Sequence, residues 1–154
     1  MDQQSYLERL RFSLVLENQT RHDQIIPTME IGLEAGHTHD VILDPDQPLN
    51  TFTFDETIHS RGTQKLQLHI KDQGKDSYKI GAVRIMDLRI HGFSVNTRLY
   101  ESTYYPVYDA EYLLDNPTAP AEISGALLLG NRGKWEYTFE TPVHDNESWR
   151  VSLV

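Results

Sequence analysis

The chain has 154 residues, of which 38% are hydrophobic and 24% charged, a balance typical of a soluble domain with its own core and not of a disordered chain. It contains no cysteine, which excludes disulfides and thiolate metal sites. The formal net charge of −9 disfavours nucleic-acid binding and suits a divalent cation or a basic partner surface.

Neither a membrane span nor a leader is expected. No apolar run approaches the roughly 20 residues that cross a bilayer. The start, Met1-Asp2-Gln3, lacks the basic and apolar regions of a signal peptide. The sequence therefore predicts a protein that begins at Met1 and does not associate with membranes.

Alternating apolar and polar residues, typical of strands with one buried face, recur along the chain. In the first half this alternation predicts strands over residues 10–16, 27–33, 41–43, 52–54 and 66–71. A polar turn at 72–76 and a second apolar run over 81–92 follow. Because no helical periodicity separates the last two runs, we expect them to form an antiparallel hairpin with an acidic tip.

The apolar phase shifts within the run over 81–92. Val83 and Ile85 share one parity, whereas Met86, Leu88 and Ile90 share the other. A strand cannot change its buried face without an extra residue. The shift predicts a β-bulge near residues 85–87, or burial of the strand on both faces.

Residues 96–121 lack a regular pattern and predict a long ordered loop. The loop is rich in tyrosine: Tyr100, Tyr104, Tyr105, Tyr108 and Tyr112. If exposed, these rings would form a stacking platform for sugars or an anchor cluster for a partner protein. Alternatively, the loop covers one end of the fold, with most of the rings buried and one or two exposed.

The alternation returns over residues 126–129, 135–139 and 149–153. In the second of these strands, Trp135, Tyr137 and Phe139 are expected in the core, with their charged neighbours facing water. The chain thus offers eight to ten short strands and no strong helix. We predict an all-β fold, an antiparallel β-sandwich or jelly roll, formed by a single domain over residues 1–154.

The turn at 72–76 is a candidate cation site. Asp72 and Asp76 flank Gly74, and Asp87 from the next strand, with Asp44 or Asp46, would add oxygen ligands of the kind that Ca²⁺ prefers. The alternative is a solvated turn, since Asp and Gly are common in turns.

His37 and His39 are a second candidate site, because two imidazoles two residues apart share a face of an extended segment. With one or two ligands from His59, His69 or Glu34 they would bind zinc. The alternative is a pair of surface histidines in a loop. No nucleophile elbow, phosphate-binding glycine loop or HExxH motif is present, so we expect no enzyme.

Lys71-Asp72, with the segment Ile-Met-Asp-Leu-Arg-Ile-His-Gly at 85–92, resembles a motif of the calcium-dependent xylan-binding carbohydrate-binding modules. These are β-sandwiches. The resemblance implies glycan binding through Ca²⁺, with Asp72 and Asp76 as ligands.

A broader resemblance runs from about residue 66 to residue 143. Tyr105-Pro106 and the segment Asn-Arg-Gly-Lys-Trp-Glu-Tyr-Thr-Phe-Glu-Thr-Pro at 131–142 are similar to small proteins of tailed phages that infect cyanobacteria and other marine bacteria. The resemblance implies a virion structural or accessory protein, made in the host cytoplasm. Such a protein would dock on capsid or tail proteins, or on its own copies, as cement and decoration proteins do. A glycan-binding module is the alternative.

Overall fold

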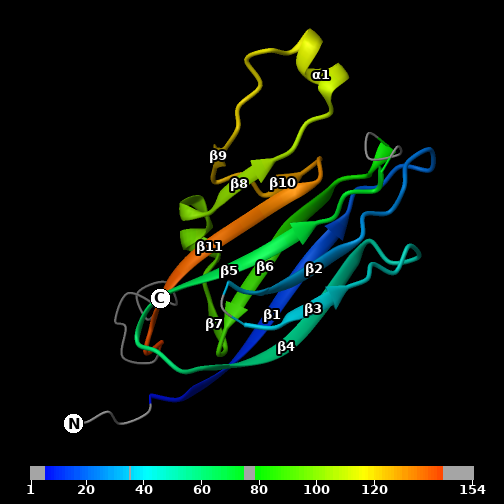
Figure 1. Ribbon diagram of the computed structural model, residues 1–154. Coiled ribbons are helices and arrows are strands. Elements are labelled where there is room, and N and C mark those ends of the chain that lie inside the picture. The colour runs from blue at the N-terminus through cyan, green and yellow to red at the C-terminus, as the bar shows by residue number, and fades with distance from the viewer. Residues whose placement is uncertain (1–5, 35, 75–78, 144–154) are drawn as a thin grey trace.

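The computed structural model describes residues 6–34, 36–74 and 79–143. Strands account for 51% of the structure and helices for 11%. The strands form two antiparallel sheets that pack against each other (Figure 1), which confirms the prediction of an all-β sandwich.

The first sheet is built around β1 (Glu8–Asn18), which pairs with β4 (Leu49–Ile58) on one side and β6 (Val83–Ile90) on the other. Two short strands, β7 (Phe93–Ser94) and β10 (Leu128–Leu129), also pair with β6. The strand order is β10-β6-β1-β4, so β4 is an edge strand of this sheet.

The second sheet has six strands, in the order β3-β2-β5-β11-β8-β9. Their bounds are β3 Thr38–Val41, β2 Met29–Leu33, β5 Gly62–Ile70, β11 Gly133–Thr141, β8 Thr103–Pro106 and β9 Ile123–Ser124. A 3₁₀ helix, η2 (Asn96–Glu101), precedes β8, and a short helix, α1 (Ala110–Asp115), follows it. The strand expected over 149–153 lies outside the described residues.

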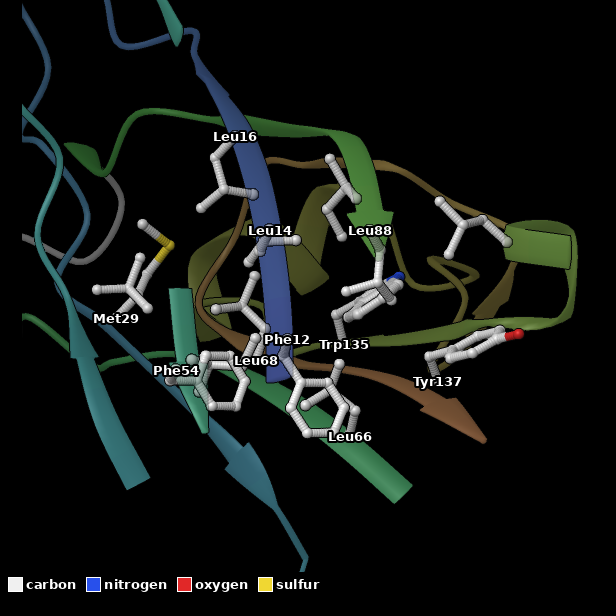
Figure 2. Close-up of a cluster of buried hydrophobic side chains, with 14 of the residues drawn as sticks. Phe12, Leu14, Leu16, Met29, Phe54, Leu66, Leu68, Leu88, Trp135 and Tyr137 are labelled. Atoms are coloured by element: carbon white, nitrogen blue, oxygen red, sulfur yellow. The ribbon is translucent and has the colours of Figure 1, made fainter. Parts of the chain in front are cut away.

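The core lies between the sheets and is built by the alternation that the sequence shows. On β1, Leu10, Phe12, Leu14 and Leu16 are fully buried, and Figure 2 shows three of them facing side chains of the opposite sheet. Phe12 stacks on Phe54 with 5.0 Å between ring centroids. The expected aromatic face of β11, Trp135, Tyr137 and Phe139, is also buried. Full burial of each such side chain contributes roughly 1.5–3 kcal/mol.

The predicted bulge is present in β6. Val15 pairs with Asp87 and Leu16 pairs with Ile85, so Met86 has no counterpart on β1. This extra residue lets Ile85 and Leu88 both face the core. The Leu88 N–H donates to Asn96 Oδ1 at 2.9 Å.

The expected hairpin between the runs 66–71 and 81–92 is wrong. The first run lies in β5, which pairs with β2 and β11, while the second forms β6 in the opposite sheet. The connection from residue 71 to 82 is much longer than the 2–5 residues usual in hairpin loops. Such a length allows the chain to cross from one sheet to the other.

The expectation of a continuous loop over 96–121 is also wrong in part. Thr103–Pro106 forms β8, in which Tyr104 pairs with Trp135 of β11. Tyr104 and Pro106 are buried, so even this short segment shows the strand alternation. In a strand of only four residues that ends in proline, the alternation of apolar and polar residues is too short to be recognised in the sequence.

Candidate functional site

The most unusual surface feature is the segment 107–122 between β8 and β9, which we call the apolar arm. The arm carries α1 and extends beyond one end of the two sheets (Figure 1). No residue of α1 is buried, and Leu114 is 81% exposed. The large apolar side chains exposed on the arm are Val107, Tyr112, Leu113 and Leu114.

Several contacts hold the apolar arm in one shape. The Tyr108 hydroxyl donates to the Pro120 carbonyl at 2.8 Å, and the Tyr108 ring stacks on Tyr112 with 5.2 Å between centroids. At the base of the arm, the Val107 N–H donates to the Arg132 carbonyl at 2.8 Å. The Arg132 guanidinium also donates to Asp109 Oδ1 at 2.7 Å. These contacts hold the arm in one conformation against the ends of β8 and β11.

The apolar arm is negatively charged. It contains Asp109, Glu111, Asp115 and Glu122 and no lysine or arginine. Asp109 is paired with Arg132, whereas the other three acids have no ion pair within the described residues. The arm therefore carries exposed apolar side chains and negative charges on the same segment.

The five tyrosines of the site predicted from the sequence differ in exposure. Tyr104 is buried, so its assignment as a contact residue is wrong. Its hydroxyl donates to the Asn131 carbonyl and accepts from the Asn131 N–H, and burial raises the pKa of Tyr104 to about 12. Tyr100 on η2 and Tyr112 on the arm are exposed, while Tyr105 and Tyr108 are partly buried.

Tyr105 borders a shallow hollow of about 470 Å³ on the six-stranded sheet. Its polar lining comes from His69, Asp72, Arg132 and Lys134. The Lys134 ammonium lies 5.1 Å from the centre of the Tyr105 ring, within cation–π range. The hollow brings together two residues that the sequence singled out separately, Tyr105 and Asp72.

The acidic residues proposed for Ca²⁺ are not brought together. Asp72 Oδ1 accepts the Gly74 N–H at 2.8 Å, whereas Asp87 lies on β6 of the other sheet, bound to Asn96 and Arg89. Asp76 lies outside the described residues. Within residues 6–34, 36–74 and 79–143, no three His, Asp or Glu side chains form a group that would hold a metal ion. Asp72 and Asp87 thus belong to segments of different sheets, each with its own hydrogen bonds.

The two histidines proposed for zinc lie in different environments. His37 is exposed before β3 begins, and His39 Nε2 lies 2.6 Å from Glu56 Oε2. This pair links β3 and β4, the edge strands of opposite sheets. Sequence reasoning missed Glu56, although the alternation Phe54, Glu56, Ile58 places it on the inward face of β4.

No family model, no curated protein and no solved structure matches the chain. No helix in the described part of the chain is long and apolar enough to cross a bilayer.

Proposed function

We propose that the protein is a non-catalytic docking protein that attaches to a larger protein assembly through the apolar arm. The supporting observation is the concentration of exposed Tyr and Leu side chains on one ordered projection. Contiguous exposed apolar surface on a monomer commonly marks an interaction site. A cluster of aromatic and aliphatic anchors is the kind of surface that dominates protein–protein binding energy.

The charge of the arm favours a particular kind of partner. Because Glu111, Asp115 and Glu122 lie on the same segment as the exposed apolar side chains, the complementary surface is an apolar pocket with basic residues near it. A second copy of this chain has the same net charge of −9, so docking of the arm on another protein is favoured over self-association through it.

The resemblance to phage proteins supplies the proposed assembly. Under this proposal the partner is a capsid or tail protein, and the chain decorates or cements the particle surface. The order that the Tyr108 and Arg132 contacts give the arm reduces the entropy lost on docking.

Co-sedimentation with purified particles tests the proposal. The wild type is expected to sediment with washed particles, and the double variant Leu113→Ser, Leu114→Ser to lose binding by about 30-fold or more, because loss of even one anchor residue costs roughly 2 kcal/mol. Ile42→Ser is the matched control, since Ile42 is 76% exposed but lies outside the arm. Absence of the wild type from washed particles contradicts the virion assignment, and equal loss in the control contradicts the role of the arm.

A second candidate function, glycan binding, is favoured by the hollow beside Tyr105. An aromatic ring next to His69, Asp72 and Lys134 offers a stacking face together with hydrogen-bonding groups for hydroxyls. Binding on a glycan array that is lost in Tyr105→Ala supports this function. Binding that survives excess chelator, or that is unchanged in the double variant Asp72→Ala, Asp76→Ala, rules out the calcium-bridged form.

A further inference from the structure

A second, smaller hollow opens at the end of the sandwich opposite the apolar arm. The arm leaves β8 beside the first residue of β11, whereas this hollow lies beside the last, where Thr141 pairs with Gly62. Its volume is about 140 Å³. Its lining includes Leu33, Gly36, Glu56, Ile58, Ser60 and Gln64.

A buried carboxylate is the distinctive group of this hollow. Glu56 is only 7% exposed, and its one hydrogen-bond partner within the described residues is His39, which contacts Oε2. The other oxygen, Oε1, is left without a partner in the described chain. This oxygen reaches the hollow, where it can accept a hydrogen bond from a donor that enters.

Gly36 keeps this oxygen uncovered. A Cβ at residue 36 would lie 3.0 Å from Glu56 Oε1 and 3.5 Å from the Leu33 side chain. Any larger residue would therefore fill the space in front of the carboxylate. The glycine therefore leaves an open space, which we call the cradle, next to Glu56 Oε1.

Gln64 adds a second acceptor. Its Nε2 donates to the Ser60 carbonyl at 3.0 Å and lies 3.4 Å from Thr141 Oγ1. The amide oxygen of Gln64 therefore keeps its accepting capacity, with no donor to it among the described residues. Leu33 and Ile58 give the hollow apolar walls that leave room for an alkyl stem, and Glu56 and Gln64, beside His59 and Ser60, give it a polar side.

We propose that this hollow is a socket for an alkylammonium group, supplied by a lysine side chain of a partner protein. A single free carboxylate oxygen suits the point charge of an ammonium, whereas a guanidinium fork prefers both oxygens. An apolar cavity of about 150 Å³ accommodates benzene, so four methylenes fit the space available. The lysine stem packs on the apolar walls while its head meets Glu56. The socket does not rest on the arm, which lies at the other end of β11.

An NMR titration with n-butylammonium chloride tests the socket. Saturable shifts are expected at the backbone amides of Gly36, Ser60 and Gln64, and n-butanol, which lacks the charge, is expected to cause none. In Glu56→Gln, which keeps the shape and the His39 contact, the affinity is expected to fall at least tenfold. Gly36→Ala keeps the charge but fills the cradle, and is expected to weaken binding similarly.

The same titration tests the source of the ammonium group. Nα-acetyl-lysine N-methylamide, which carries flanking peptide groups, is expected to bind at least as well as n-butylammonium. Absence of saturable shifts in the wild type, equal binding in Glu56→Gln, or equal binding of n-butanol overturns the socket. Exclusion of the lysine derivative while n-butylammonium binds overturns the partner lysine.

Discussion

Deletion of Met86 is expected to leave the fold intact, because Met86 is the extra residue of the bulge. Val15 and Leu16 are consecutive on β1, and their partners Asp87 and Ile85 become consecutive once Met86 is removed. The shortened strand then alternates regularly, with Ile85 and Leu88 still facing the core. No other residue of β6 changes its face.

The size of the effect follows from the exposure of Met86. Its side chain is 43% exposed, so the deletion loses at most about 1.5 kcal/mol of burial. Removing one ordered residue returns about 1–2 kcal/mol of conformational entropy. The two effects oppose each other, and the free energy of unfolding is expected to change by no more than about 1 kcal/mol.

Deletion of Arg89, an exposed residue of the same strand, is the matched control. Without Arg89, either Leu88 or Ile90, both fully buried, must turn outward, and Asp87 or His91 must turn inward. Exposing one of these apolar side chains and burying one of these polar side chains together lower the free energy of unfolding by at least about 3 kcal/mol. Urea unfolding measures both free energies. Equal destabilisation by the two deletions would refute the role of Met86 as a bulge residue.

Three further predictions concern turns and tyrosines. Tyr104→Phe removes both hydrogen bonds between the Tyr104 hydroxyl and the Asn131 main chain, each worth roughly 0.5–1.5 kcal/mol, so urea unfolding is expected to show a loss of about 1–3 kcal/mol, and Tyr105→Phe little loss; equal losses contradict this. Because burial raises the pKa of Tyr104 and Tyr137 to about 12, above the ordinary 10, their stabilisation is complete below pH 10 and is lost as the pH rises through 12. Phenolate absorbance measures this, and ionisation of all tyrosines near pH 10 with the fold intact contradicts it. His91→Asn is expected to stabilise the protein by up to about 1 kcal/mol in the same urea assay, because His91 (φ 53°) precedes Gly92 in a two-residue turn with both φ values positive; destabilisation contradicts this.

The sequence predicts the faces of strands better than their partners. Burial at every second residue of β1, the buried aromatic face of β11 and the phase shift at Met86 are local patterns, and each of them is seen in the structure. The expectation that the charged neighbours on β11 face water is wrong for Glu136, which is buried and accepts a hydrogen bond from Gln67. Strand pairing depends on contacts between distant residues. The run over 66–71 has the same alternation whether it pairs with the next strand or with β11, so the hairpin could not be distinguished from a crossing between sheets.

The candidate sites show the same limit. The sequence places five tyrosines close together, but it did not separate buried Tyr104 from exposed Tyr112. The run Tyr112-Leu113-Leu114 between acidic residues is the one local signal that would have indicated the apolar arm, and the sequence analysis did not use it. The proximity of Glu56, Gly36 and Gln64 comes from three different parts of the chain, and no sequence spacing indicates it.

Photo-crosslinking on assembled particles tests the central claim most directly. The photoreactive residue p-benzoylphenylalanine is placed at position 114 on the apolar arm, or at position 42 as the exposed control. The proposal predicts one major crosslink from position 114 to a capsid or tail protein, and none to that protein from position 42. The absence of a crosslink from position 114, with the protein present on the particles, would contradict docking through the arm.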